Sequence, residues 1–333
     1  MAKSTNNPTI SDIAKKAGVS STTVSRVLSD SDSVKPKTKD KVQKVIDELG
    51  YIPNYFARCL AGHQSKKIGV IVDEIGNFFF TELLASIQGY LNKNNYSIQI
   101  AYSKWHEESE LDAVKNFISN NVDGIIIAPV SPTTSALDLL KNRDFPFVVI
   151  NCILDDETTC IANNNYDGGK IIADYFNERE AEQTFVISGW NDQSLLLRVK
   201  GFKENINNKE KLNCFSEILL DDQIREVARK LVEDYDVKNK TTNIFITNDI
   251  LAIPLSNYLI DNGVDIPNSV SIISYDNIYF SKYSRIPLST IDHGIDEIGI
   301  QASAQLLKKI NNEKATKGNI FIEPKLIIRE STR

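Results

Sequence analysis

The sequence has few of the residues that build metal sites, disulfide frameworks or membrane spans. Its four cysteines include no Cys-x-x-Cys pair, and its three histidines lie far apart in the chain. Neither pattern suits a metal ion, and the thiols are expected to be reduced and mostly buried. No stretch approaches the ~20 consecutive apolar residues of a membrane helix. A disulfide-stapled, metal-binding or membrane-spanning protein is therefore not expected.

Signals for export and for catalysis are also missing. The opening MAKSTNNPTI has no apolar signal-peptide core, which predicts a cytoplasmic protein. We find no low-complexity segment, nucleophile elbow or phosphate-binding loop, so neither an enzyme nor a cofactor is expected. With 333 residues, 41% of them apolar and 25% charged, the chain is long enough for two or three ordinary globular domains.

Charge is spread unevenly along the chain. Residues 1–62 hold ten Lys and Arg against six Asp and Glu, and the remaining residues hold 28 against 38. The first part therefore carries +4 and the rest −10. A small basic head on an acidic body suits a polyanion that is contacted at one end only, such as nucleic acid.

The stretch Thr9 to Leu28, TISDIAKKAGVSSTTVSRVL, predicts two short helices joined by a tight turn. Thr9 suits the N-cap of the first helix, with Asp12 in the capping-box position. Gly18 suits its end, because glycine adopts left-handed backbone at little cost. Ser20 suits the N-cap of the second helix. This arrangement is typical of a helix-turn-helix motif, whose second helix enters the major groove of DNA.

The second helix separates an apolar face from a polar face. Its apolar side carries Val24, Val27 and Leu28, and its polar side carries Ser21, Thr22, Ser25 and Arg26. A third helix is predicted from Pro36 to Leu49, with proline in its first turn. An ordinary helical hairpin within a bundle is the alternative interpretation of this pattern taken alone.

After Lys67 the pattern changes to apolar runs that alternate with helical patterns. Runs that are apolar throughout are typical of strands buried on both faces, and alternation with helices predicts a doubly wound α/β body. Some 265 residues are too many for one such sheet, so two sub-domains are expected. The expected strands are 68–72, 125–128, 147–150, 185–187, 244–246 and 270–273. The expected helices are 81–93, 109–120, 167–177, 195–206, 223–235, 249–262 and 296–310.

Polar residues follow the predicted strands. In open parallel sheets, ligands bind beyond the carboxyl ends of the strands. Carboxylates and amides there can accept hydrogen bonds from sugar hydroxyls, while an aromatic ring covers the apolar side of a sugar. These residues include Asp73, Asn151, Trp190, Asn248, Asp249 and Asp276. Asp and Asn also favour helix starts, so simple capping is the alternative, most clearly for Asp249.

The run AGVSSTTVSRVL…KTKDKVQKVIDELGYIPNYFARCLAG closely resembles the amino-terminal module of the lactose-repressor family of bacterial transcription factors. The resemblance covers some fifty ordered positions and continues more loosely to the carboxyl end. It implies a head at residues 1–53, a hinge helix and linker at 54–66, and a periplasmic-binding-protein-like effector and dimerisation domain at 67–333. The sub-domains expected are 67–162 with 293–321 and 163–292 with 322–333, with crossings near Ala162, Asp292 and Ile322.

The resemblance also implies how DNA is held. Two copies would place their second helices in successive major grooves, where Ser21 and Thr22 touch base edges and Arg26 reaches a guanine or a phosphate. The hinge helix is too short to be stable alone, and in the family it folds in the minor groove. Leu60 matches the apolar wedge of that helix. The DNA-binding set expected is Ser21, Thr22, Ser25, Arg26, Tyr51, Asn54, Ala57 and Leu60.

For the effector, the resemblance selects particular side chains. Arg198 in SLLLRVKGF matches the family's effector-binding arginine. Asp249 in ITND and Asp276 in ISYDN match the carboxyl-half motifs. Phe79 and Phe80 match the aromatic pair that leans over the ligand, although core packing is the expectation for one of them. The effector-binding set expected is Asp73, Phe79, Phe80, Asn151, Trp190, Arg198, Asn248, Asp249, Asp276 and His293.

Two of these positions depart from the family pattern. Asn151 replaces a common Asp, which changes that contact, and His293 stands where many members have a basic or amide residue; a lone histidine is more often structural. The prediction is a cytoplasmic, homodimeric repressor of a pseudo-palindromic operator, controlled by an uncharged sugar, with details similar to sucrose-type regulators. Alternatives are a purine or phosphorylated carrier protein acting as co-repressor, a sugar transport protein, and a glycosidase.

Overall fold

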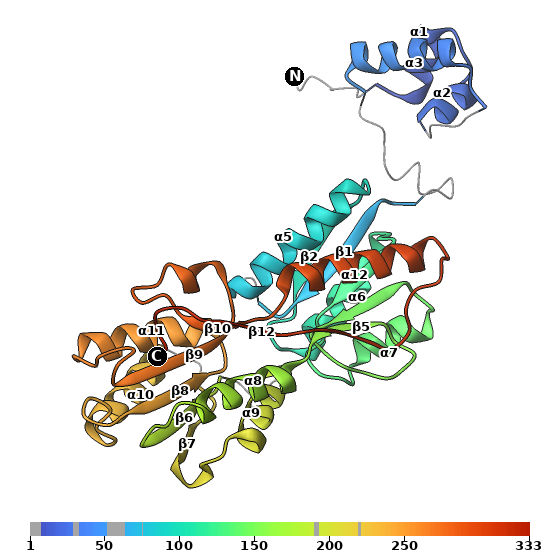
Figure 1. Ribbon diagram of the computed structural model, residues 1–333. Coiled ribbons are helices and arrows are strands. Elements are labelled where there is room, and N and C mark those ends of the chain that lie inside the picture. Colours follow the sequence, from blue (N-terminus) through green and yellow to red (C-terminus); the bar gives the residue numbers. More distant parts are fainter. Residues whose placement is uncertain (1–7, 29–32, 52–63, 75, 190–192, 219–220) are drawn as a thin grey trace. The chain divides into compact units, whose positions relative to one another are not determined.

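The computed structural model describes residues 8–28, 33–51, 64–74, 76–189, 193–218 and 221–333. The chain divides into two compact units, Met1–Ser65 and Lys66–Arg333 (Figure 1). The first is helical, and the second is built on two sheets covered by helices. The predicted fold class, a helical head with a doubly wound two-sheet body, is confirmed. Within the described ranges, no helix is long and apolar enough to cross a membrane.

The head consists of α1 (Ile10–Ala17), α2 (Ser21–Leu28) and α3 (Pro36–Leu49). The predicted capping box is present: Thr9 Oγ1 accepts from the Asp12 backbone N at 3.3 Å, and the Thr9 N donates to Asp12 Oδ2 at 2.9 Å. Gly18 ends α1 with a φ of +62°. Ser20 Oγ accepts from the Thr23 backbone N at 3.1 Å and so caps α2. The turn between the two helices is thus fixed by local hydrogen bonds and one glycine.

One small apolar core holds the three head helices together. Ala14 and Ala17 are small enough to let α1 pack closely on its neighbours. The buried residues of this core are Ile13, Ala14, Ala17, Val24, Val27, Val34, Val42, Val45, Ile46 and Tyr51. The polar side of α2 is left facing outward.

The first lobe of the body is a parallel six-stranded sheet in the order β11-β5-β4-β3-β1-β2. Helices α5 (Phe78–Lys93) and α12 (Ile295–Ile310) pack on one face, and α6 (Glu107–Ser119) and α7 (Ser135–Asn142) on the other. Because both faces are covered, the central strands are apolar throughout. The strands are β1 (Lys67–Val72), β2 (Ser97–Tyr102), β3 (Gly124–Ile127), β4 (Phe147–Ile150), β5 (Cys160–Asn163) and β11 (Asn319–Ile322).

The second lobe repeats this design in the order β12-β10-β9-β8-β6-β7, with only β12 antiparallel to its neighbour. Helices α10 (Asp221–Glu233) and α11 (Asp249–Asp261) cover one face, and α8 (Asn165–Asn177) and α9 (Gln193–Asn205) the other. The strands are β6 (Gln183–Ile187), β7 (Leu212–Phe215), β8 (Thr242–Ile246), β9 (Val270–Asp276), β10 (Ser289–Asp292) and β12 (Lys325–Ile327). The short 3-10 helices are η1 (Lys209–Lys211) and η2 (Tyr279–Lys282).

The chain passes between the two lobes three times. It leaves the first sheet after β5, returns after β10 to form α12 and β11, and leaves again for β12 (Figure 1). The crossings therefore lie beyond Asn163, Asp292 and Ile322. Since the carboxyl ends of β5, β10 and β11 all lie at the lobe junction, these three segments run beside one another there.

The apolar-run pattern missed several elements at the margins of the sheets. β2 is an edge strand that is mostly exposed or half-buried, so it lacks a continuous apolar run. β10 and β11 have only four residues each. Helix α7, with eight residues, also went unpredicted. Short or edge elements carry too few buried side chains to show a period.

Helices α8 and α9 cross backbone to backbone. A Cβ added to Gly201 would lie 2.0 Å from the carbonyl O of Tyr166, and one added to Gly169 would lie 2.0 Å from the carbonyl O of Arg198. Real side chains cannot approach a backbone oxygen so closely. The two glycines therefore permit a contact that places Arg198 against α8.

We predict that Gly201→Ala destabilises the body by at least the ~1–3 kcal/mol typical of overpacking. The matched control is Gly89→Ala in α5, where a Cβ meets no atom within 4 Å. An added methyl at an exposed helical glycine should stabilise by ~0.5–1 kcal/mol. Urea unfolding of both variants measures the difference, and equal effects at the two sites would contradict the close-crossing argument.

Candidate functional site

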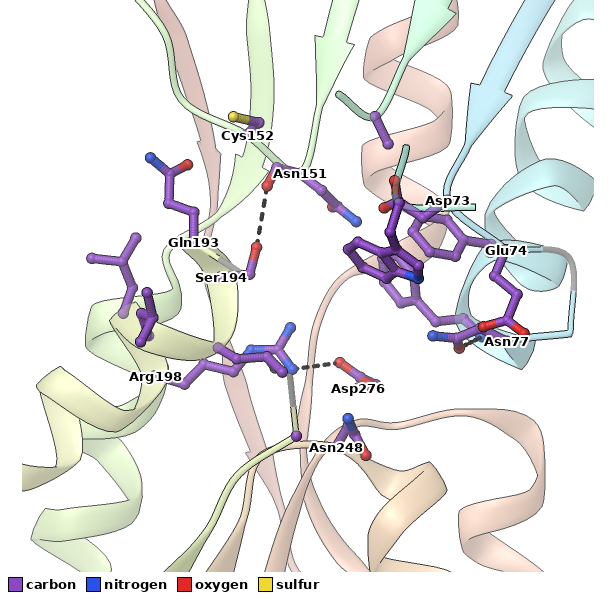
Figure 2. A pocket seen from close by; sticks show the side chains of 18 of the residues that line it. Asp73, Glu74, Asn77, Asn151, Cys152, Gln193, Ser194, Arg198, Asn248 and Asp276 are labelled. Atoms are coloured by element: carbon purple, nitrogen blue, oxygen red, sulfur yellow. Dashed lines mark hydrogen bonds and ion pairs between the residues drawn. The ribbon is translucent and has the colours of Figure 1, made fainter. Parts of the chain in front are cut away.

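A cavity of about 970 Å³ lies between the two lobes of the body. The first lobe contributes residues that follow β1, β3 and β4, and the second contributes the start of α9 and residues that follow β8, β9 and β10. Figure 2 shows Asp73 and Asn151 on one side, with Arg198, Asn248 and Asp276 facing them. The carboxyl ends of the strands thus meet here, as expected for open parallel sheets.

Arg198 on α9 is almost completely buried, with 3% of its surface exposed. Its Nε donates to Asn165 Oδ1 at 2.8 Å, and its Nη1 donates to the Thr247 carbonyl O at 2.7 Å and to Asp276 Oδ1 at 2.9 Å. The Tyr275 ring lies against the guanidinium, 3.8 Å from Cζ to the ring centroid. An unpaired buried charge would cost several kcal/mol, so these contacts fix the side chain in one position.

Asp276 and His293 complete this buried cluster. His293 Nδ1 lies 3.0 Å from Arg198 Nη2 and 3.2 Å from Asp276 Oδ1. Burial opposes the charge of Asp276, but Arg198 and His293 outweigh it and hold the pKa of that carboxyl below its usual value. Burial lowers the pKa of His293, so the ring is neutral at pH 7. Its Nε2 is buried and finds no hydrogen-bond partner in the described chain.

In the first lobe, Asn151 also has a buried polar atom without a hydrogen-bond partner among the described residues. Its Oδ1 is buried and has no partner among the described residues, and its backbone adopts a φ of +58°. Its carbonyl O accepts from Ser194 Oγ at 3.1 Å, a contact between the lobes (Figure 2). The neighbouring Ile153 N donates to Gln193 Oε1 at 3.2 Å. These two hydrogen bonds between described residues therefore join the lobes on this side.

Asp73 and the aromatic pair also border the cavity. Asp73 is buried and accepts from Ser103 Oγ at 3.2 Å. Phe79 and Phe80 both line the cavity and both belong to the core of the first lobe, with ring centroids 5.1 Å apart. The Phe79 ring lies 4.8 Å from the His293 ring. One of the two rings was expected to pack in the core and the other to face a ligand. In the structure each ring packs in the core and also borders the cavity.

Asn248 borders the cavity as expected, but it is also the residue that caps α11, the alternative role weighed for Asp249. Asn248 lines the cavity and is itself the N-cap of α11, because its Oδ1 accepts from the Leu251 backbone N at 2.9 Å. Asp249 is not among the lining residues and is fully buried. Burial and the nearby Asp276 raise the pKa of Asp249 to about 7.

The Asp249 carboxyl group holds the loops beneath the cavity together. It accepts from Ser274 Oγ, from Thr290 Oγ1 at 2.9 Å and from the Ile278 backbone N at 2.9 Å. With these three donors occupied, its oxygens are turned toward β9, β10 and the segment before η2. The structure thus places Asp249 behind the cavity rather than in its lining.

The ionised groups that line the cavity are mostly acidic. Among the described lining residues, Asp73, Glu74 and Asp276 are acidic, and Arg198 and Lys200 are basic. Because Arg198 already donates to protein acceptors, little positive charge remains for an anionic ligand. An uncharged polar molecule fits this balance better than a phosphate ester does.

In the head, the expected DNA-contacting face of α2 is exposed. Ser21, Thr22, Ser25 and Arg26 all lie on the surface. Tyr51 instead packs in the head core, and its backbone N donates to the Ile46 carbonyl O at 3.1 Å. Asn54, Ala57, Leu60 and the effector candidate Trp190 lie outside the described residues.

Sequence reasoning missed the residues that hold the site together. Asn165 and Thr247 orient Arg198, while Gln193 and Ser194 join the lobes. Asparagine at the start of a predicted helix reads as an ordinary cap, so Asn165 gave no distinct signal. In the part of the chain that the structure describes, no group of His, Cys, Asp or Glu could hold a metal ion. Of the described cysteines, Cys152 and Cys160 are buried and Cys214 is exposed.

Comparisons with known proteins agree with both units. A model of the bacterial regulatory proteins of the lacI family matches residues 9–54, and a model of a periplasmic binding protein-like domain matches residues 174–332. The HTH-type transcriptional repressor PurR of Vibrio atlanticus (strain LGP32) is 27% identical over 330 residues, which cover 98% of each chain.

Two solved structures extend the comparison. The lac repressor dimer bound to operator and the anti-inducer ONPF aligns with a TM-score of 0.84 and 23% identity, covering 98% of this chain and 99% of that one. A periplasmic binding protein/LacI transcriptional regulator from Alkaliphilus metalliredigens QYMF, complexed with D-xylulofuranose, aligns with a TM-score of 0.70 and 27% identity, covering 80% and 99%.

A helix-turn-helix head on a two-lobed body of the periplasmic-binding type, with a polar cavity between the lobes, defines the class of ligand-binding transcription regulators. Within that class, residues 9–54 match the lacI family of bacterial regulatory proteins, and relatives that align along nearly the whole chain are transcriptional repressors. The resemblance predicted from the sequence is thereby confirmed.

The buried neutral His293 predicts a pH dependence of stability. Because folding lowers its pKa, the unfolded chain binds this proton more tightly, and the contribution of His293 is lost as pH falls below the ordinary value of ~6.5. We expect urea unfolding to show that wild type loses more stability between pH 7.5 and 5.5 than His293→Gln does. The exposed His106→Gln is the control. A His293→Gln profile parallel to wild type would contradict this assignment.

Proposed function

We propose that this chain is a transcriptional repressor that binds operator DNA through its head and changes operator affinity when a small molecule occupies the cavity of its body. One observation carries the proposal. The chain combines a head that matches the lacI family and exposes the polar face of α2 with a body whose cavity is lined by His293 and Asn151. Each of these two residues has a buried polar atom without a hydrogen-bond partner among the described residues, which a ligand could supply.

DNA recognition would follow from the polar face of α2. Ser21 and Thr22 would contact base edges in the major groove, and Arg26 would reach a guanine or a phosphate. Two copies would contact two half-sites of a pseudo-palindrome. Residues 54–60 would form hinge helices in the minor groove, with Leu60 wedged into a base step and Asn54 and Ala57 beside it. Tyr51 would support the start of the hinge from within the head core.

The effector we propose is an uncharged sugar. A hydroxyl group can both donate and accept, so it satisfies His293 Nε2 in either ring tautomer and can donate to Asn151 Oδ1. Phe79 and Phe80 provide apolar faces for a sugar ring, and Trp190 is a further candidate. The relative complexed with D-xylulofuranose supports this ligand class.

Control of DNA binding requires that the ligand prefer one arrangement of the lobes. A ligand with equal affinity for both arrangements would shift nothing. A sugar that favours the arrangement in which the hinge helices of a homodimer separate would release DNA, which makes it an inducer in the cytoplasm. A purine that tightens operator binding would make this chain a co-repressor-type regulator instead, as would a phosphorylated carrier protein.

The effector site is tested by a melting screen of the purified full chain against mono- and disaccharides including sucrose, sugar phosphates and nucleobases. Saturation at a hundred times the dissociation constant adds ~2.7 kcal/mol to stability. We predict a shift with at least one uncharged saccharide and none with its phosphate ester, because carboxylates predominate in the cavity. A shift with phosphorylated sugars alone would contradict the proposed ligand class.

Arg198→Ala should abolish that saccharide-induced shift and the accompanying operator release while operator binding itself persists. Loss of the guanidinium also leaves Asp276 buried without its cation, which should destabilise the body by ~3–5 kcal/mol. Lys203→Ala, an exposed position on the same helix, is the matched control. An Arg198→Ala protein that folds, by circular dichroism, and still responds with unchanged saccharide affinity would rule out this site.

For the head, Arg26→Ala should weaken binding to a DNA fragment selected by the wild-type protein by about tenfold, since one good base contact contributes ~1–3 kcal/mol. Lys44→Ala, an exposed position on α3, removes the same charge and is the control. Affinities measured by fluorescence anisotropy should fall steeply with salt. An equal, small loss in both variants would mean that Arg26 contributes only general charge.

A further inference from the structure

A single buried side chain ties together the three segments that cross between the lobes. Asn163 ends β5 at the first crossing, and its Nδ2 donates to the carbonyl O of His293 and to the carbonyl O of Ile322, each at 3.0 Å. These carbonyls belong to the second and third crossings. Asn163 is 1% exposed, so no water competes for these bonds.

The same amide is connected to the effector cluster. Its Oδ1 accepts from the Tyr275 hydroxyl, and the Tyr275 ring lies against the guanidinium of Arg198. The Asn163 carbonyl O accepts from Asn165 Nδ2 at 3.2 Å, and Asn165 Oδ1 in turn accepts from Arg198 Nε. One face of the guanidinium and its Nε edge are therefore positioned by groups that contact Asn163.

His293 belongs to both systems at once. Its carbonyl O accepts from Asn163, while its imidazole lies beside Arg198 and its buried Nε2 has no partner among the described residues. A ligand atom bound to Nε2 would therefore act on a residue whose backbone forms part of the second crossing. The next residue, Gly294, has a φ of +71°, and a Cβ added there would lie 2.5 Å from Ile322 Cγ2, so the second and third crossings also pack closely.

We propose that Asn163 is a positioning residue that locks the angle between the lobes and, through Tyr275 and Asn165, holds Arg198 and His293 in place for the effector. Asn163, Tyr275 and Asn165 do not line the cavity. We call the hydrogen bonds of the Asn163 side chain to His293, Ile322 and Tyr275 the lock. Its regulatory role rests on the proposed function: a ligand bound to His293 and Arg198 shifts the angle between the lobes through these bonds. The lock itself is a property of the body and is measurable without DNA or effector.

Two nearly isosteric variants separate the bonds of the lock. Asn163→Asp keeps the acceptor for Tyr275 but lacks the two donors to the crossing carbonyls. Tyr275→Phe removes only the hydroxyl and keeps the ring against Arg198, so it should fold even if Asn163→Asp does not. Tyr175→Phe is the matched control, because it loses a comparable hydroxyl bond, to the Arg333 carbonyl O at 2.8 Å, within the same lobe.

The test is hydrogen exchange of the full chain, read by mass spectrometry on peptides that cover residues 163–166, 292–295 and 322–325. We expect Tyr275→Phe to speed exchange about tenfold in these peptides, while peptides from β3 and β8 in the two sheets keep wild-type rates and Tyr175→Phe changes neither. Unchanged exchange at the crossings, or an equal rise in the sheets, would overturn the proposal, because the bond would then serve general stability alone.

A second readout addresses regulation. The affinity of each variant for the DNA fragment selected by wild type should change at least threefold for Tyr275→Phe and not for Tyr175→Phe, although neither residue lies in the head. Wild type that binds no DNA would refute the proposed function and leave the exchange result to decide on the lock. Wild type that binds DNA, with unaltered affinity in Tyr275→Phe, would refute the coupling.

Discussion

The body is organised around one buried guanidinium, that of Arg198, whose N–H groups need hydrogen-bond acceptors. Arg198 is almost completely buried, so acceptors for its N–H groups must come from the protein or from a bound molecule. It draws these from Asn165 at the start of α8, from the end of β8 and from Asp276 at the end of β9. Its position also requires the close crossing of α8 and α9 at Gly169 and Gly201. The ion pair of Arg198 with Asp276, the close crossing of α8 and α9, and this wall of the cavity therefore depend on one another.

The same construction explains why the cavity suits a ligand. Arg198 and Asp276 are hydrogen-bonded within the protein, whereas His293 Nε2 and Asn151 Oδ1, on two residues that line the cavity, are buried without partners in the described chain. A buried polar atom without a hydrogen bond costs ~1–3 kcal/mol. A molecule that supplies both bonds recovers this free energy only where the two lobes come together, which links occupancy to the angle between them.

Local patterns in the sequence predicted the elements whose cause is local. The capping box of Thr9 and Asp12 and the left-handed Gly18 depend on residues within one turn, and the structure contains both. Apolar runs located β1, β3, β4 and β8 because burial on both faces leaves no polar position. Asp249 shows the limit: its place in ITND suggested a ligand contact, but only the fold reveals donors from Ser274, Thr290 and Ile278 that hold it behind the cavity.

Neighbouring residues and one ordered motif predicted the lacI-family resemblance, the helix-turn-helix head and the alternation of strands and helices. Which side chains share the cavity, and which lie behind it, follows from the folded chain alone. Asn163 contacts His293 and Ile322 across separations of 130 and 159 residues. Such contacts exist only once both sheets have formed and their crossings lie together, and no local pattern records them.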